Sequence, residues 1–323
     1  WMNANVLRIW NKPTSWYRSA AAIVGAQQQY NYGGDLTGRQ YHVYAETQLA
    51  NLWNISAFTI QRPATLDDRL LRGGPAVGRP ALRYYEANVG SDGRKRVSFN
   101  SNANIGRTSD GRGSYSGSVG ISIKPSSRVL ASLSPTFSHE EGSAEYVRGF
   151  TDPSATAFFG NRTVVADLEQ NTLSMETRLS VTFTPALTLQ LFAQPFVASG
   201  DYTRFKEFVQ PHSGATREFD GTQLTTLRGG GGRDSAYVLD PDRDASTANF
   251  RFGNPDFNFR SLRGNAVVRW EYRPGSTLFF VWQQERSGGE EYGDFRLSRD
   301  AGSVFRDRPD NVFVIKASWW LSR

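Results

Sequence analysis

A strict alternation of apolar and polar side chains, repeated in many long segments, is the feature that most constrains how this chain can fold. Residues 261–273 show it most clearly. One set of alternate positions in this segment is apolar or small: Leu262, Gly264, Ala266, Val268, Trp270 and Tyr272. Because successive side chains of a β-strand point to opposite faces of its sheet, the pattern predicts strands with one apolar face and one wet face.

About 13 segments follow this pattern. They are residues 3–10, 16–30, 39–50, 55–61, 81–89, 96–107, 114–123, 128–138, 172–183, 187–198, 259–272, 277–286 and 311–321. The clearest runs last about 10 to 14 residues, whereas strands of soluble proteins cluster near about 5 to 6 and membrane-spanning strands need about 9 to 11. This length favours membrane-spanning strands over the alternative, a soluble β-sandwich or propeller.

The links between these segments alternate between short and long. Short links fall at residues 11–15, 52–54, 90–95, 124–127, 184–186 and 273–276, and longer ones at 31–38, 62–80, 108–113, 139–170, 199–258 and 287–310. Outer-membrane barrels pair short periplasmic turns with long external loops. We therefore expect one all-β domain over residues 1–323, a closed antiparallel transmembrane β-barrel of about 14 or more strands in the bacterial outer membrane. Since such barrels have even strand numbers, the odd count predicts at least one further strand before Trp1.

Composition excludes several other classes of protein. The longest apolar run, residues 20–26, is far shorter than the ~20 residues that a spanning helix needs. The chain has no Cys, which excludes disulfides and thiolate metal sites. Its 37 Lys and Arg residues are interleaved with 31 Asp and Glu residues, which argues against nucleic acid as a partner. No start Met and no charged-then-apolar leader precede Trp1, so we expect a mature product or a fragment.

Four stretches carry a resemblance to a known family. They are residues 70–75 (LLRGGP), 91–95 (SDGRK), 183–190 (FTPALTLQ) with 194–196 (QPF), and 270–276 (WEYRPGS). In these stretches, and over most of its length, the chain resembles the domain of unknown function 5916 family. The resemblance implies the C-terminal outer-membrane barrel of a longer protein, with an upstream family 9 carbohydrate-binding-like domain as a partner. It implies no catalytic residues.

Charged side chains on the predicted wet face are the candidates for a solute path. They are His42, Glu46, Glu176, Arg178, Arg263, Arg269, Glu271, Arg273 and Lys316. With more cations than carboxylates among them, they predict a mildly basic interior that would favour anionic or sugar-like solutes. The alternative is that these charges pair across strands and only satisfy the interior. We therefore expect porin-like passage of small polar or anionic solutes, or else a non-conducting membrane anchor or scaffold for a binding domain or protein partner.

Two sets of residues are candidates for contact with lipid. Aromatic residues near the short links predict an interfacial belt, with ordinary core packing as the alternative: Trp10, Trp16, Tyr17, Trp53, Trp270, Tyr272 and Trp319. Four arginines of the link at 62–80 are expected to bind lipopolysaccharide-type phosphates of the outer leaflet: Arg62, Arg69, Arg72 and Arg79.

The long links contain two weaker signals of chemistry. Asp240, Asp242 and Asp244 place three carboxylates at alternate positions, which is compatible with Ca²⁺, although a solvated acidic loop is the simpler explanation. His139 and His212 are the residues on which a remote alternative, an outer-membrane hydrolase, would rest. Neither histidine has a third catalytic partner in the sequence pattern. No cofactor is expected apart from this calcium ion.

Overall fold

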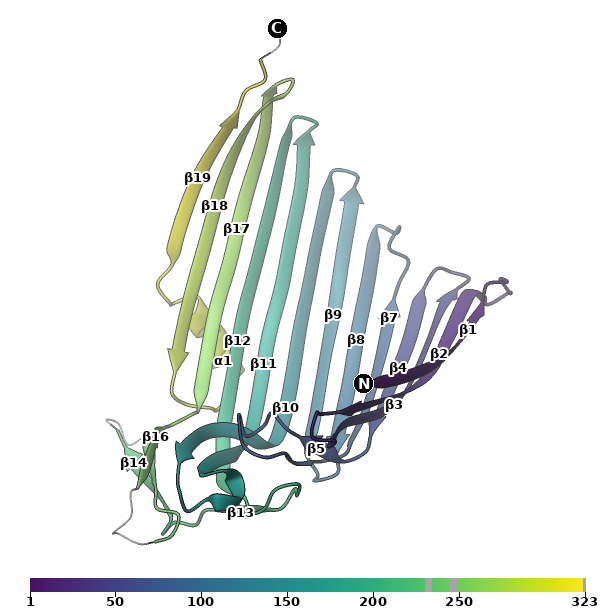
Figure 1. Ribbon diagram of the computed structural model, residues 1–323. Coiled ribbons are helices and arrows are strands. Elements are labelled where there is room, and N and C mark those ends of the chain that lie inside the picture. The colour runs from purple at the N-terminus through teal and green to yellow at the C-terminus, as the bar shows by residue number, and fades with distance from the viewer. Residues whose placement is uncertain (230–233, 244–248, 322–323) are drawn as a thin grey trace.

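The computed structural model describes residues 1–229, 234–243 and 249–321. A single large antiparallel sheet dominates it, and its strands follow one another in chain order (Figure 1). The strands along this path are β1 (Met2–Trp10), β2 (Tyr17–Tyr30), β3 (Leu36–Leu49), β4 (Asn54–Arg62), β7 (Leu82–Gly90), β8 (Val97–Thr108), β9 (Gly113–Ser126), β10 (Val129–Thr151), β11 (Asn161–Thr184), β12 (Leu187–Phe208), β17 (Phe257–Arg273), β18 (Ser276–Glu290) and β19 (Asp310–Ser318). Each of them overlaps a segment that the alternation predicted.

The prediction of a closed transmembrane barrel is wrong. In the described part of the chain β1 pairs with β2 alone and β19 with β18 alone, so the sheet is open between its first and last strands. Neighbouring strands alternate in direction, and 11 strands lie between β1 and β19 along the sheet. The two edge strands therefore run in the same direction, towards the short-link end. Two such strands cannot form an antiparallel ladder with each other. Alternation fixed which face each side chain takes, but it carries no information on closure.

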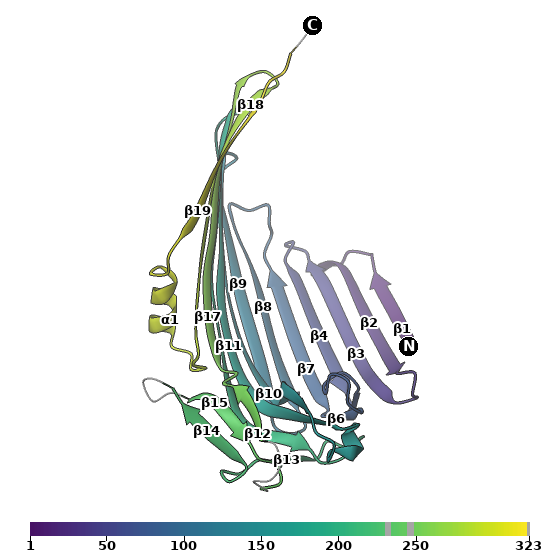
Figure 2. The same ribbon diagram turned by 60° about the vertical axis from the view of Figure 1, so that its left-hand side comes forward.

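The longer links fold, together with the adjoining ends of β10, β11 and β12, into a structure at one end of the sheet, which we call the cap and which comprises residues 63–81, 142–170, 199–229, 234–243 and 249–256. It holds the short elements β5 (Thr65–Asp67), β6 (Val77–Arg79), η1 (Thr156–Phe158), β13 (Thr216–Glu218), β14 (Leu224–Arg228), β15 (Asp234–Leu239) and β16 (Phe250–Gly253). Figure 2 shows these elements gathered below the sheet. Irregular pairing near Gly142 and Tyr146 interrupts the β10–β11 ladder where these strands enter the cap, and such bulges bend a strand.

The cap contains both clusters of buried apolar side chains in the described residues. One is formed by Val164, Ala166, Phe205, Phe219, Tyr237, Leu239 and Phe252, and the other by Leu71, Val77, Val165 and Phe208. The buried Asp167 accepts hydrogen bonds from Lys206 and Arg112 beside them. Burial of a charge is tolerated when it is paired in this way. The compact core of the molecule therefore lies in the cap, where the ends of β11 and β12 pack against the long links.

One helix, α1 (Leu297–Val304), interrupts the link between β18 and β19. It contacts β12, β17 and β18. It lies on one side of the sheet, and β1–β4 curve towards the other side (Figure 2). Among the described residues, no helix has the length and apolar character that crossing a bilayer requires.

Replacing Leu239 by Ala should destabilise the cap by about 2–5 kcal/mol, because the fully buried side chain would leave a cavity. Hydrogen exchange of cap amides in detergent solution measures the loss. The control is Leu191→Ala, since Leu191 of β12 is 36% exposed and contributes little to a core. Equal loss of protection in the two variants would contradict the assignment of the core to the cap.

Candidate functional site: the two faces of the open sheet

The strand register sorts the side chains of the main sheet into two faces. Val43, Tyr85 and Ile105 belong to one cross-strand row, which we assign to the apolar face. Glu46 and Asn88 belong to a row of the opposite face, which we call the polar face. Because side chains alternate along each strand, every strand contributes to both faces. The polar face is the concave one, since β1–β4 curve away from the side that carries α1 (Figure 2).

Exposure on the two faces is opposite to that of a soluble sheet. On β9 the apolar residues Val119, Ile121 and Ile123 are 47%, 42% and 43% exposed. On β7 the polar residues Glu86 and Asn88 are only partly exposed. In water a sheet buries its apolar face and exposes its polar one. The apolar face of this sheet is therefore exposed, unlike that of a water-soluble β-sandwich.

Aromatic residues border the apolar face at both ends. At the short-link end, the rings of Trp16 and Tyr17 lie 4.6 Å apart and those of Trp270 and Tyr272 lie 6.1 Å apart. Trp53 contacts Phe99 with ring centroids 5.1 Å apart. The other predicted belt residues, Trp10 and Trp319, are exposed at the same end. This clustering is typical of a membrane interface.

A second aromatic row lies near the cap, and the sequence analysis missed it. It contains Tyr41, Tyr85 and Tyr115, which are 48%, 50% and 50% exposed. Tyr115 also stacks on His139 with ring centroids 4.9 Å apart. These tyrosines lie on the apolar face in the halves of their strands nearer the cap, so their alternation with polar residues could have revealed them.

The polar face carries a continuous hydrogen-bonded array across five neighbouring strands, β3 to β9. We call it the polar ladder, and its members are Tyr44, Glu46, Ser56, Tyr84, Glu86, Asn88, Asn102, Asn104 and Ser116. Its centre is Glu86, which accepts hydrogen bonds from Tyr84 at 2.8 Å, Asn88 at 3.0 Å and Asn102 at 3.1 Å. The amide of Asn102 also donates to Asn88 at 2.6 Å. These bonds fix the side chains of adjacent strands in one arrangement.

The ladder continues to both sides of its centre. Tyr44 donates to Glu46 at 2.6 Å, Asn88 donates to Ser56 at 3.2 Å, and Asn104 donates to Ser116 at 2.6 Å. A hollow of about 540 Å³ lies beside it, lined in part by Tyr44, Glu46, Ser56, Asn88 and Asn102. Neutral amides and hydroxyls make up most of the polar ladder. Its two charged members are Glu46 and Glu86.

Several predicted solute-path residues lie on the polar face, but the structure does not gather them into one site. Glu46 belongs to the ladder, and His42 lies on the same face with its ring 6.3 Å from that of Phe58. The remaining charges are dispersed along β11–β19. Three local ion pairs hold most of them: Glu176 with Arg178 at 2.8 Å, Arg263 with Glu285 at 3.2 Å, and Arg269 with Glu271 at 2.9 Å. Lys316 of β19 lies opposite Phe279 of β18, and Arg273 of β17 lies opposite Ser276 of β18, at separate positions along these strand pairs.

The four arginines predicted to bind lipid phosphate do not form one cluster. Arg62 ends β4, and Arg79 lies in β6 opposite Thr65. The guanidinium of Arg72 lies 3.8 Å from the ring centroid of Tyr146. The backbone N–H of Arg69 donates to Asp67 at 2.9 Å. Their binding to lipid phosphate stays a prediction.

The predicted calcium and hydrolase residues have ordinary polar contacts. Asp240 accepts a hydrogen bond from the backbone N–H of Arg243 at 2.9 Å, and Asp244 lies outside the described residues. Over residues 1–229, 234–243 and 249–321, no group of three or more His, Cys, Asp or Glu side chains could hold a metal ion. His139 is 2.9 Å from the side-chain oxygen of Asn171, and His212 is 3.1 Å from Asp35.

With this geometry in place, the chain can be compared with known proteins. The model of a family described as "Domain of unknown function (DUF5916)" matches residues 2–322. The chain belongs to this family. No curated protein matches it. The description of DUF5916 names no activity, so the site must be interpreted from its own chemistry.

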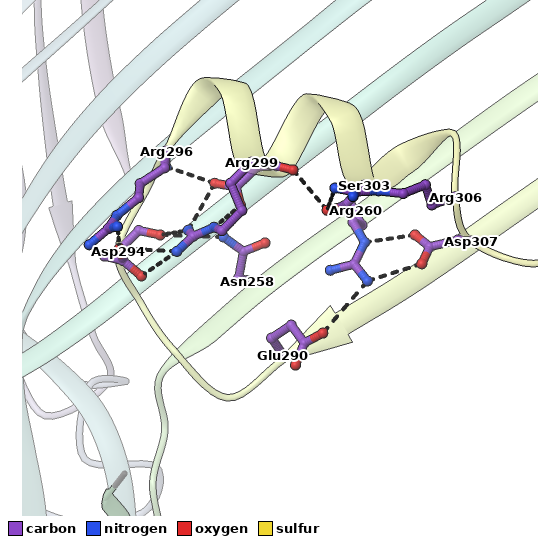
Figure 3. A network of polar contacts seen from close by, with 10 residues as sticks. Asn258, Arg260, Glu290, Asp294, Arg296, Arg299, Ser303, Arg306 and Asp307 are labelled. Atoms are coloured by element: carbon purple, nitrogen blue, oxygen red, sulfur yellow. Dashed lines mark hydrogen bonds and ion pairs between the residues drawn. The ribbon is translucent and has the colours of Figure 1, made fainter. Parts of the chain in front are cut away.

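This DUF5916 protein also holds a strap across its apolar face, formed by residues 291–309 with α1 at their centre. Arg260 of β17 makes a bidentate ion pair with Asp307 of the strap, at 2.7 and 3.0 Å (Figure 3). The amide of Asn258 donates to the backbone carbonyl of Asp294 at 3.4 Å. Both β17 residues share their parity with Leu262 and Trp270. The strap therefore covers the apolar face where β12, β17 and β18 approach the cap.

The strap should loosen in acid. Burial raises the pKa of Asp300, but hydrogen bonds from the Arg299 side chain and the Arg296 backbone outweigh it, so its pKa lies below the usual aspartate value. Because of this lowered pKa, the ionised carboxylate stabilises the folded strap at pH values above the unfolded pKa of about 3.9. This stabilisation is lost as the pH falls through the folded pKa. We expect α1 amides to exchange faster below about pH 4, which hydrogen exchange measures.

Asp300→Asn tests this origin. It should make exchange in α1 fast already at neutral pH and remove most of its dependence on pH. The matched control is Asp220→Asn in the cap, because the pKa of Asp220 is also lowered, but by hydrogen bonds from Thr222 and not by any residue of the strap. A strap that stays protected in Asp300→Asn at every pH would refute the assignment.

Proposed function

We propose that this protein is a membrane-embedded β-sheet that acts as an anchor and scaffold in the bacterial outer membrane. The observation that carries the proposal is the exposed apolar face of the sheet, on which Val119, Ile121 and Ile123 of β9 are open while Glu86 and Asn88 of β7 on the polar face are only partly exposed. Apolar surface of this extent is unfavourable in water at about 25 cal/mol per Å². Hydrocarbon removes that penalty. Membrane proteins built from strands are characteristic of outer membranes.

The dimensions of the strands support the same proposal. β1 and β4 have 9 residues each, and β2, β3 and β9 have 14 each. A tilted strand needs about 9–11 residues to cross the hydrocarbon layer. Aromatic residues at both ends of the apolar face are positioned as interfacial anchors. The cap, with its own core, would then lie on one side of the membrane together with any lipid phosphates that its arginines bind.

The open edges support a role as a scaffold. All nine residues of β1 are exposed, and so are nearly all of β19. In hydrocarbon each unpaired backbone N–H or C=O costs several kcal/mol, so an edge strand requires a partner there. Edge strands are templates for pairing with another chain. We therefore propose that strands of a protein partner pair with β1 and β19.

A charge on the apolar face should impair membrane insertion. Val119→Arg places a guanidinium on that face of β9 and should cost about 2–4 kcal/mol near the middle of the membrane. The measurement is the fraction of protein that resists urea extraction from membranes. Ser118→Arg is the matched control, because Ser118 is the preceding residue and lies on the polar face. If both variants remain in the membrane fraction equally, the apolar face is not the lipid contact.

The polar ladder favours a second candidate function, which is guidance of small polar solutes across the membrane. Rows of polar side chains along a membrane-spanning surface are the usual lining of such paths. The open sheet alone does not enclose a channel, so conduction would require the partner strands at its edges. Planar-bilayer conductance of the purified assembly distinguishes the two functions: steady ion flow supports solute passage, and a folded but silent assembly supports the anchor.

A further inference from the structure

We propose that the polar ladder is a binding site for a neutral saccharide. The inference rests on the side-chain chemistry of the concave face over β3–β9 and does not require the proposed membrane function. Its elements are a preorganised array of hydrogen-bonding groups, an adjoining row of aromatic rings and a hollow that contains no basic side chain.

The hydrogen-bonding array is already fixed before a ligand arrives. Glu86 holds Tyr84, Asn88 and Asn102 at 2.8, 3.0 and 3.1 Å, and Asn102 in turn holds Asn88. The amides of Asn88 and Asn102 use both donor hydrogens within the ladder, and each carbonyl oxygen has a second lone pair with which it can accept a hydroxyl group of a ligand. A ligand with many hydroxyl groups offers donors and acceptors at close spacing. Preorganisation lowers the entropy lost when such a ligand binds.

Aromatic rings adjoin this array on the same face. The ring of Phe58 lies between those of Tyr44 and Tyr84, with centroids 6.4 Å away on each side. Tyr44 also lines the hollow. An aromatic ring offers a flat apolar surface, and Tyr adds a polar tip. The C–H face of a pyranose can pack on such a ring while its hydroxyl groups reach amides and carboxylates alongside.

The size and charge of the hollow narrow the ligand class. Its volume of about 540 Å³ lies within the range of small-molecule sites, about 300–1,000 Å³. Among the described residues that line it, Glu46 is the one charged side chain and none is Lys or Arg. An anionic solute would therefore be repelled, which differs from the sequence-based expectation. Neutral hydroxyl and amide side chains make up most of the polar lining, which favours a hydroxylated ligand.

The test is isothermal titration of the full chain in detergent micelles, where membrane insertion does not enter the result. Two neutral trisaccharides, maltotriose and cellotriose, are the probes, and spermidine and citrate are the charged comparisons. We expect saturable binding of at least one trisaccharide and none of citrate. Tyr44→Ala and Asn102→Ala should each weaken it at least about tenfold, equivalent to about 1.4 kcal/mol.

Two further variants separate binding from folding. Tyr44→Phe keeps the ring and should retain binding within about threefold, a change of less than about 0.7 kcal/mol. Gln190→Ala alters the same face at a distance from the hollow and should leave binding unchanged. The proposal is overturned if neither trisaccharide binds saturably, if spermidine binds in their place, or if Tyr44→Ala and Asn102→Ala bind as tightly as the wild type.

Discussion

Backbone hydrogen bonds between consecutive strands are the interaction on which the whole structure depends. Both buried apolar clusters of the described residues lie in the cap, and the strands of the main sheet are held in register by unbroken backbone pairing such as that of β1 with β2 and of β12 with β17. These backbone hydrogen bonds are retained where water is absent, because an N–H or C=O group that loses its partner there cannot bond to water instead. The sheet can therefore present a fully apolar surface, and the same requirement makes its two open edges sites for partner strands.

The two faces divide the work of the molecule. The apolar face, with aromatic rings at both ends, matches a lipid layer, and the strap is held over part of it by Arg260 and Asp307. The polar face collects Tyr, Asn, Ser and Glu side chains that satisfy one another across β3–β9. Folding places the hydrophobic core in the cap, so the cap can be stable at the proposed membrane surface. The main sheet is a single layer with an apolar face on one side and a polar face on the other.

Much of the fold could be predicted from the sequence, and less of the site. Alternation located the thirteen strands that follow one another along the main sheet, because a period of two leaves a direct signature in residues such as those of β17, but it did not locate β13, which pairs with β12. The candidate site was predicted largely from charge. That choice found Glu46, but it also selected Arg178, Arg263 and Arg269, whose local ion pairs leave them dispersed. The ladder was missed because Asn88, Asn102 and Ser116 are uncharged and far apart in the chain. Counting polar residues on the wet face of consecutive strands would have indicated it.

The sequence by itself determined the strands, their two faces and the alternation of short and long links, because each of these is a local property of side-chain order. Tertiary structure alone decided that the sheet stays open, that the long links build a cap with its own core, and that the amides of Asn88 and Asn102, from two neighbouring strands, converge on Glu86. Those outcomes depend on cross-strand register and on strand direction at the two edges. Register is set by pairing between distant segments, and no single segment contains that information.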